Sequence, residues 1–238
     1  MSLQMNTTKN NLCIIPARGG SKRISKKNIK FFSGFPIIAY SVRAAIESNL
    51  FEEVMVSTDD QEIAEIAMKY GAKVPFFRSE KASDDFATTL DVIKEVAHEY
   101  RETGRYFQNF CCLYATAPFV TPDKLKNAFQ VLISNNYDSV LPVMRFSFPI
   151  QRAFEMNSDF KLKYQYEEFR DLRSQDFKEC FHDAGQFYWM KKSILDTDSI
   201  ITNNTGAIEI SNLEGQDIDD ETDWKLAELK YKLLQSYR

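Results

Sequence analysis

The feature that most constrains the fold of this chain is a regular alternation of short apolar segments with longer amphipathic ones. In segments of helical length, such as 36–48, apolar residues recur every three or four positions, whereas the segments between them are continuous apolar runs. We expect strands at 12–16, 53–58, 73–77, 110–114, 139–144, 186–190 and 206–210, and helices at 36–48, 59–68, 89–101, 122–133 and 221–236. This alternation predicts an α/β fold, with a Rossmann-like, mostly parallel sheet and helices on both of its faces.

The alternation stops between residues 149 and 181, where aromatic residues are scattered among many charges. The segment 156–159, Met-Asn-Ser-Asp, has the composition of a hairpin turn, so we expect an inserted β-rich arm. Aromatic surface without a sheet to pack on is typical of an interface, which indicates a dimerisation arm. We therefore expect a single domain over 10–238 that contains this arm, preceded at 1–9 by a tail that is disordered or derived from an expression vector.

Composition argues against several classes of function. The 238 residues carry a formal net charge of −4, which disfavours general nucleic-acid binding. No apolar run approaches the roughly 20 residues that span a bilayer, and the polar N-terminus lacks a secretory signal, so we expect a cytoplasmic protein without membrane contact. The two histidines are too few for a multi-histidine metal site. No CxxC pair occurs, and we expect four reduced thiols, at Cys13, Cys111, Cys112 and Cys180.

A basic loop that contains two glycines follows the first predicted strand. Six Lys and Arg residues fall within 18–30, and Gly19 and Gly20 let the backbone approach a ligand closely. Ligands of doubly wound sheets bind beyond the carboxyl ends of the strands, and a triphosphate needs several cations to offset its charge. We therefore interpret this loop as a phosphate-binding site, although it has neither Walker A nor GxGxxG spacing. The alternatives are a solvated basic loop and a nucleic-acid patch.

Two aspartates near the C-terminus, Asp217 and Asp219, lie two residues apart. In an extended segment such residues project to the same face, where two carboxylates can hold a hard divalent cation. The alternative is that the acidic run at 219–221 caps the helix that follows it. Both roles are compatible if a neighbour such as Asp220 caps the helix. We interpret a second acidic run, at 57–60, as a helix N-cap.

Long motifs over nearly the whole chain resemble one family. The stretch IIPARGGSKRISKKN and the segments VSTDDQEIAEIAMKYGAKVPFFR, RSEKASDDFATT, LYATAPFVT and DIDDETDW are similar to the cytidylyltransferases that activate sialic acids and related nonulosonic acids. The resemblance implies CTP as donor, an acidic nine-carbon sugar as acceptor, Mg²⁺ as cofactor, and a homodimer whose arm reaches over the partner's active site. Within the family, FHDAGQFYW at 181–189 most resembles the pseudaminic acid enzymes, because the neuraminic acid enzymes typically have an NGAIY-like segment there.

The resemblance also implies roles for individual residues. The catalytic positions are Arg18, Lys27 and Asp219, and the metal-binding positions are Asp217 and Asp219. The nucleotide-binding positions are Ala17, Arg18, Gly19, Gly20, Ser21, Lys22, Lys27, Asn28, Arg78, Ala115 and Thr116. The sugar-binding positions are Gln175, His182, Asp183 and Gln186, although the pair at 182–183 also suits a surface turn. Tyr114 departs from the family, because sialic acid synthetases usually have glutamine there, so backbone groups are expected to contribute more to cytosine recognition.

The implied reaction transfers CMP from CTP to the anomeric hydroxyl of a nonulosonic acid, with pseudaminic acid as the expected acceptor, and releases pyrophosphate. Such an in-line displacement depends mainly on positioning and charge stabilisation. Arg18 and Lys27 would offset phosphate charge, and a metal on the aspartate pair would orient the attacking hydroxyl. The alternatives are the same reaction on N-acylneuraminic or legionaminic acid, a non-catalytic nucleotide- or RNA-binding module, and a glycosyltransferase of similar architecture.

Overall fold

The computed structural model describes residues 10–21, 23–83 and 87–237. Its central sheet has the strand order β11-β6-β10-β5-β1-β4, with β9 also paired to β6. The strands are β1 (Asn11–Pro16), β4 (Glu53–Ser57), β5 (Asn109–Leu113), β6 (Ser139–Arg145), β9 (Phe181–Asp183), β10 (Phe187–Lys191) and β11 (Thr205–Glu209). β1 runs parallel to β4 and β5, and β11 runs parallel to β6, whereas β10 is antiparallel to both neighbours. The predicted mostly parallel α/β sheet is confirmed.

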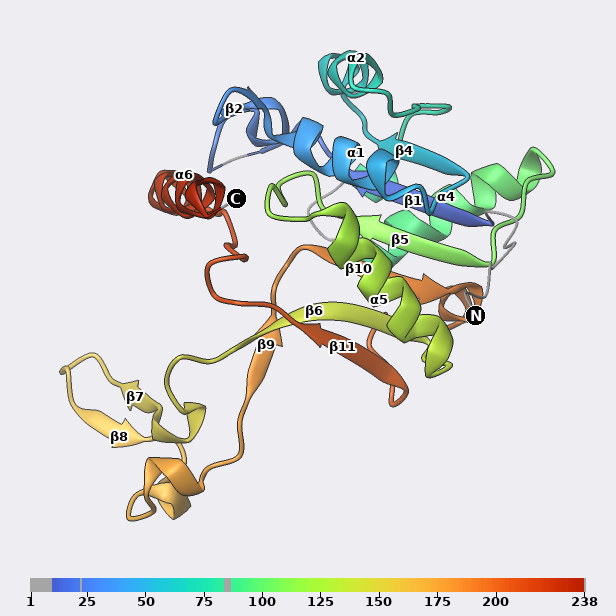
Figure 1. Cartoon of the computed structure of the whole chain (residues 1–238). Helices are drawn as coiled ribbons and strands as arrows, with labels where there is room; N and C mark the ends of the chain where they lie inside the picture. Colours follow the sequence, from blue (N-terminus) through green and yellow to red (C-terminus); the bar gives the residue numbers. More distant parts are fainter. Residues whose placement is uncertain (1–9, 22, 84–86, 238) are drawn as a thin grey trace.

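Helices cover both faces of this sheet, as predicted (Figure 1). The helices α1 (Ile37–Ser48), α2 (Gln61–Lys69) and α5 (Pro122–Ser134) bury their apolar residues on one face, and α4 (Thr89–Glu102) buries its own on the other. Alternate residues of β1 enter the two cores, Cys13 on one side and Ile14 on the other, which explains its continuous apolar run. The last helix, α6 (Glu221–Ser236), closes a smaller core through Trp224, which packs near Phe32.

Side chains at the helix N-termini set where these helices begin. The carboxylate of Asp60 accepts the N–H of Ile63 at 3.0 Å, so the predicted N-cap of α2 is confirmed. Thr88 begins α4 with a capping box, and Asp220 does the same for α6. The remaining short elements are β2 (Phe31–Phe32), β3 (Phe35–Pro36), α3 (Glu80–Ser83), η1 (Lys27–Ile29) and η5 (Lys192–Asp196).

The predicted strand at 73–77 is wrong. Only Lys73 pairs with the edge strand β4, donating its N–H to the carbonyl of Val54 at 2.9 Å and accepting the N–H of Val56 at 2.8 Å. Pro75 follows two residues later and has no N–H to donate, so the ladder does not continue along this edge.

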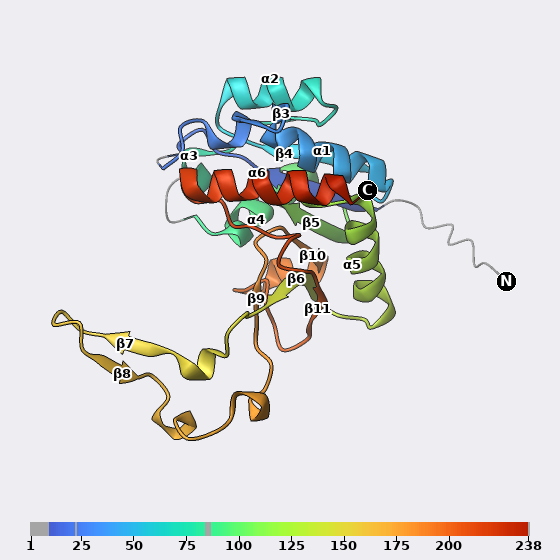
Figure 2. The same ribbon diagram turned by 60° about the vertical axis from the view of Figure 1, so that its left-hand side comes forward.

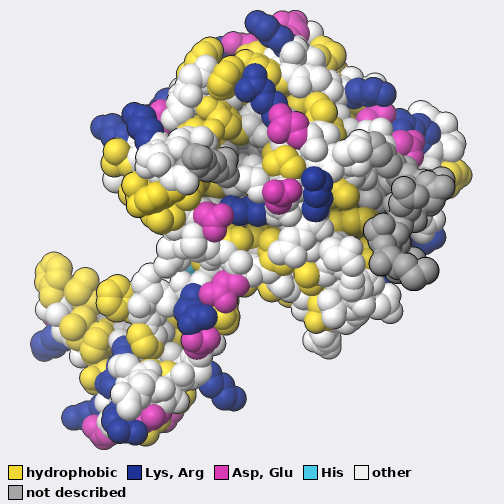
Figure 3. All heavy atoms as spheres, viewed as in Figure 1, with side chains coloured by type: hydrophobic (Ala, Val, Ile, Leu, Met, Phe, Trp, Pro, Cys, Tyr) yellow, Lys and Arg dark blue, Asp and Glu magenta, His cyan; other side chains and the backbone are white. Residues whose placement is uncertain are grey.

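The segment 149–181 projects from the body of the molecule (Figures 1 and 2). It contains a short hairpin of β7 (Phe154–Met156) and β8 (Leu162–Tyr164), which turns at the predicted place, and three turns of 3-10 helix, η2 (Ile150–Arg152), η3 (Glu167–Phe169) and η4 (Ser174–Asp176). Apolar side chains gather on its surface (Figure 3). The most exposed of them is Phe160, at 80%, followed by Met156 and Leu162, each at 62%.

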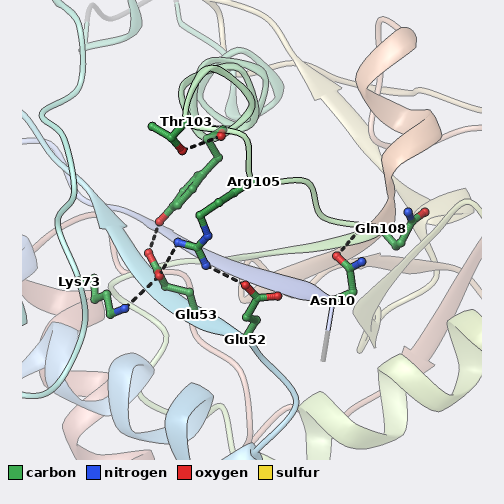
Figure 4. Close-up of polar contacts among 8 residues, drawn as sticks. Asn10, Glu52, Glu53, Lys73, Thr103, Arg105 and Gln108 are labelled. Carbon is green, nitrogen blue, oxygen red and sulfur yellow. Dashed lines mark hydrogen bonds and ion pairs between the residues drawn. The ribbon is translucent and has the colours of Figure 1, made fainter. Parts of the chain in front are cut away.

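An ion-pair network around the buried carboxylate of Glu53 joins the edge strand β4 to the loop after α4 (Figure 4). The carboxylate of Glu53 accepts hydrogen bonds from the Tyr100 hydroxyl, from Arg105 at 2.8 Å and from Lys73 at 3.1 Å. Burial alone would raise the pKa of Glu53, but these three donors together hold it below its ordinary value.

Two expectations from composition concern thiols and membranes. Cys13, Cys111 and Cys112 are buried, and they and the half-buried Cys180 are all free thiols, as predicted. Within the described residues, we find no helix with the length and apolar character needed to cross a membrane. The predicted N-terminal tail at 1–9 lies outside the described residues.

Candidate active site

A cavity of about 600 Å³ lies beyond the carboxyl ends of β1 and β5. β1 ends at Pro16 and β5 ends just before Tyr114, and both residues line this main cavity. Seven of the predicted nucleotide-binding residues line it, namely Arg18, Ser21, Lys27, Asn28, Arg78, Ala115 and Thr116. Three loops that are far apart in the sequence therefore meet at this cavity, as expected for a ligand site beyond the carboxyl ends of the strands.

The basic loop is held by hydrogen bonds to the neighbouring strand end. The N–H of Ala17 donates to the Ser57 carbonyl at 2.9 Å, and the N–H of Gly19 donates to the Asp59 carboxylate at 2.8 Å. A Cβ on Gly19 would lie 2.7 Å from a carboxylate oxygen of Asp60, so only glycine fits there. The Gly19 amide is thus engaged within the protein, while Gly20 faces open space.

Three more of the predicted nucleotide-binding residues belong to this loop. Asn28 is buried, and its side-chain amide donates to the Arg18 carbonyl at 2.9 Å, which fixes the course of the loop. Ala17 is also buried and does not line the main cavity. Lys22 lies outside the described residues.

The charged residues that line the main cavity are mostly cations. Among the residues that the structure describes they are Arg18, Arg23, Lys27, Arg78 and one carboxylate, Asp219. Arg78 is buried and donates to the Ser57 hydroxyl at 3.0 Å, and burial lowers the pKa of its guanidinium. In a chain of net charge −4, this concentration of positive charge suits a polyanionic ligand.

Lys27 joins the basic loop to the acidic segment before α6. Its ammonium donates to the carbonyl of Ile218 at 2.7 Å, between the two aspartates. Burial lowers the pKa of Lys27, and the carboxylates of Asp219 and Asp217 act in the opposite direction. The side chain of Lys27 therefore links two parts of the site.

In the acidic segment at 217–220, helix capping and cavity lining fall on different aspartates, as the sequence allowed. Asp220 accepts the N–H groups of Thr222 and Asp223 and caps α6, so the cap does not require Asp219. Asp219 lines the main cavity and pairs with Arg23 at 2.7 Å. Asp217 lines an adjoining cavity of about 440 Å³.

Residues of α6 hold this acidic segment in place, and sequence reasoning missed them. Lys230 donates to the Gly215 carbonyl and to the side-chain oxygen of Gln216, both at 2.9 Å. Asp223 accepts the N–H of Asp219 at 3.0 Å. No local pattern marks Lys230, because its partners lie 14 and 15 residues away in the sequence.

The adjoining cavity shares Tyr114 and Thr116 with the main cavity, so the two spaces meet there. Of the predicted sugar-binding residues, Asp183 lines it. The Asp183 carboxylate accepts the N–H of Gly185 at 2.7 Å and the hydroxyl of Tyr188. Tyr188 also lines this cavity, but its place in an apolar strand gave no reason to select it from the sequence.

The other predicted sugar-binding residues lie away from both cavities of their own chain. His182 neighbours Asp183 in β9 and does not line either cavity, as expected because successive strand residues face opposite ways; its ring lies 4.9 Å from that of Phe146. Gln186 is buried, and its amide donates to the Glu214 carbonyl instead of facing a ligand. Gln175 is exposed in the projecting arm.

Among the residues that the structure describes, no group of three or more His, Cys, Asp or Glu side chains could hold a metal ion. The pair Asp217 and Asp219 nevertheless fits Mg²⁺, which is usually held by one or two carboxylates together with substrate phosphates. These two carboxylates face adjoining cavities. A polyanionic ligand in the main cavity would therefore have Asp219 and the cations Arg23 and Lys27 close to one another in the same wall.

Comparison with known proteins gives a consistent result. A family model described as cytidylyltransferase matches residues 12–203. A pseudaminic acid cytidylyltransferase of Campylobacter jejuni is 41% identical over 224 residues, which cover 94% of this chain and 97% of that protein. A CMP-N,N'-diacetyllegionaminic acid synthase of Legionella pneumophila is 30% identical over 227 residues, with the same two coverages.

A solved structure of a CMP:2-keto-3-deoxy-manno-octonic acid synthetase in complex with CTP has a TM-score of 0.69 to this chain at 17% identity, and the match covers 95% of this chain and 99% of that one. At this identity the likeness shows the shared fold. The family model and the 41% identical relative extend over most of the sequence. The chain therefore belongs to the cytidylyltransferase family, as its motifs predicted.

Proposed function

We propose that this chain transfers CMP from CTP to the anomeric hydroxyl of pseudaminic acid and releases pyrophosphate. The observation that carries the proposal is a cavity whose charged lining residues are mostly cations and which meets a second cavity at Tyr114 and Thr116. Asp219 lines the first cavity, and Asp217 lines the second. One space suits a triphosphate and the other suits an acceptor sugar. The choice of acceptor rests on the 41% identity to a pseudaminic acid cytidylyltransferase.

In this proposal the reaction depends on positioning and on charge. Arg18, Lys27 and Arg78 neutralise the triphosphate, and Lys27, which lines the main cavity, offsets charge that develops on the leaving pyrophosphate. Ala115 and Thr116 form the wall beside the nucleoside. The acceptor hydroxyl attacks the α-phosphorus from the adjoining cavity, in line with the leaving group.

We also propose Mg²⁺ as the cofactor, held by Asp217 and Asp219 together with phosphate oxygens. When bound, it would supply positive charge that orients the acceptor hydroxyl and lowers its pKa. Asp219→Asn keeps the shape of the side chain but removes one charge, so we expect pyrophosphate release to fall steeply and to require more Mg²⁺. Because Asp220 caps α6, the variant should keep its melting temperature. A lowered melting temperature with an unchanged Mg²⁺ titration would contradict this role.

The third part of the proposal is a homodimer formed through the arm at 149–181. Its support is the exposed apolar surface of the arm, where Phe160 is 80% exposed and Met156 and Leu162 are each 62% exposed. In a dimer, Gln175 of one subunit would be available to the partner's acceptor cavity. Light scattering should give the mass of a dimer at micromolar concentration, and Phe160→Glu should weaken it. A wild-type monomer at that concentration would contradict the proposal.

The proposed reaction is tested by pyrophosphate release with CTP and a panel of acceptors. We expect pseudaminic acid to give the highest kcat/KM, with N-acetylneuraminic and diacetyllegionaminic acids as the competitors. ATP, GTP and UTP should support little release. Faster turnover of either competing acid would correct the acceptor, whereas no release with any nonulosonic acid would refute the proposed activity itself.

A further inference from the structure

Another cavity, which we call the far cavity, borders the C-terminal end of α4. It has a volume of about 520 Å³ and is lined by residues that fall within 97–110 and 192–196. Ala97 and Arg101 of α4 line it, whereas Thr89 and Val92 of the same helix line the main cavity. At 1.5 Å per residue, Thr89 and Arg101 lie about 18 Å apart along the helix. The far cavity is therefore separate from the candidate active site, and its size suits a small-molecule ligand.

Part of the lining is held in place by contacts within the protein. Phe107 and Phe110 both line the far cavity and are buried. The guanidinium of Arg105 lies 5.2 Å from the centre of the Phe107 ring. It points toward two carboxylates and donates to Glu53 at 2.8 Å and to Glu52 at 2.9 Å (Figure 4). Because these contacts use the charge of Arg105, this residue forms a wall of the cavity and is not available to a ligand.

Two other cations of the lining are available to a ligand. Arg101 lies in the last turn of α4, Lys192 is the first residue of η5, and both are exposed. Within the described part of the chain, neither side chain forms an ion pair or a hydrogen bond. Two such cations at one cavity favour an anionic group. A phosphate suits them best, because its several oxygens accept hydrogen bonds from both side chains at once.

Three further residues of the lining favour a ligand with more than an anionic group. Tyr106 is 65% exposed, so its ring offers a face on which a flat ring can stack. The Asp196 carboxylate, also part of the lining, would repel a simple anion, but it accepts hydrogen bonds from hydroxyl groups. The side-chain amide of Gln108 has no partner among the described residues, and it can donate or accept.

These features together select one class of ligand. Inorganic phosphate would use the two cations and leave Tyr106 and Asp196 without a partner. A fatty acid would add an apolar chain but would bring no hydroxyl to Asp196. A nucleoside monophosphate offers a phosphate, a flat base and the two hydroxyls of its ribose.

We propose that the far cavity is a second nucleotide site, which takes a nucleoside 5′-monophosphate. The phosphate binds Arg101 and Lys192, the base stacks on Tyr106, and the ribose hydroxyls donate to Asp196. This site is independent of the proposed function, because it lies at the other end of α4 from the main cavity.

The first test measures binding to the wild-type protein in the absence of an acceptor sugar, so that no turnover occurs. Calorimetry with AMP as the probe should show saturable binding, and adenosine and inorganic phosphate should each bind about 10-fold more weakly or worse, because each lacks half of the contacts. Saturation-transfer NMR should place the strongest transfer on the protons of the adenine ring. Equal affinities for AMP and phosphate would reduce the site to one for simple anions, and tighter binding of pseudaminic acid than of AMP would assign it to a sugar acid; either result overturns the proposal.

The second test locates the bound AMP with variants of exposed residues, which should keep their melting temperatures. Arg101→Met and Lys192→Met should each weaken AMP binding by about 10-fold or more, the range for one hydrogen bond to a charged group. Tyr106→Ala should weaken AMP binding without changing the affinity for phosphate, since it removes only the stacking face. The control is Lys69→Met, which removes an exposed cation from the last turn of α2 and should leave AMP binding unchanged.

A variant of the main cavity separates the two sites. Arg18→Met should lower the affinity for CTP and leave that for AMP unchanged, whereas Arg101→Met should do the reverse. The absence of saturable AMP binding at millimolar concentration would overturn the proposal. So would AMP binding that Arg18→Met weakens and Arg101→Met does not, because the nucleotide would then occupy the main cavity.

Discussion

Replacing Lys27 by methionine tests the link between the basic loop and the acidic segment. The ammonium bonds to the Ile218 carbonyl at 2.7 Å in a half-buried position, and a hydrogen bond from a charged group contributes about 1.5–3 kcal/mol. For a chain of this size that loss lowers the melting temperature by about 3–10 °C. If Lys27 also stabilises the leaving pyrophosphate, kcat should fall by about 100- to 1,000-fold, the usual cost of one such contact.

The matched control for this variant is the neighbouring lysine. Lys26 forms an exposed ion pair with Glu62, a type of contact that contributes about 0–1 kcal/mol, so Lys26→Met should change neither the melting temperature nor kcat appreciably. Both variants are compared by differential scanning fluorimetry and by pyrophosphate release at saturating CTP. Wild-type turnover in folded Lys27→Met would remove this residue from the mechanism. An unchanged melting temperature would refute the structural link.

Three further predictions follow from contacts around the site. Gly19→Ala should raise the KM for CTP and cost about 1–3 kcal/mol of stability, because its Cβ would lie 2.7 Å from a carboxylate oxygen, whereas Gly20→Ala, with nothing within 4 Å, should be tolerated. Glu53 has a lowered pKa in the folded state, so its contribution to the free energy of unfolding is present above the unfolded pKa of about 4.3 and is lost as pH falls through the folded pKa. The melting temperature of Glu53→Gln should therefore depend less on pH in that acidic range than the melting temperature of the wild type. Lys230→Met should lower the affinity for Mn²⁺ measured by calorimetry with CTP present, while Lys232→Met, exposed on the same helix, should not; equal affinities in both would refute the positioning of the acidic segment by α6.

The fold was predictable from the sequence because each layer of the sheet leaves a distinct periodicity. The continuous apolar runs of β1 and β5 reflect burial on both faces, and the helices between them carry one apolar side. The direction of β10 was not encoded, since a buried apolar run has the same pattern in a parallel and an antiparallel strand. The apolar pattern of 73–77 predicted a strand, but the pairing stops after Lys73 because Pro75 has no N–H to donate.

The parts of the site that lie in loops after strand ends were predictable from the sequence. The parts that depend on tertiary contacts were not. The basic loop and the acidic pair stood out by charge and spacing. Tyr188 did not, because a tyrosine in an apolar strand is ordinarily a core residue, and only the fold brings its hydroxyl to Asp183. Gln186 illustrates the converse: its side chain is polar, but it is buried and donates to the backbone at Glu214, which the sequence did not indicate.

The central claim is that the α-phosphate of CTP passes to an acidic sugar, and its most direct test follows that phosphate. CTP labelled at the α- or the γ-phosphate is incubated with the protein, Mg²⁺ and pseudaminic acid, and the products are separated. The account predicts that the α label appears in a CMP-sugar and the γ label in pyrophosphate, in equal amounts. Transfer of the γ label, or no labelled sugar from either substrate, would contradict it.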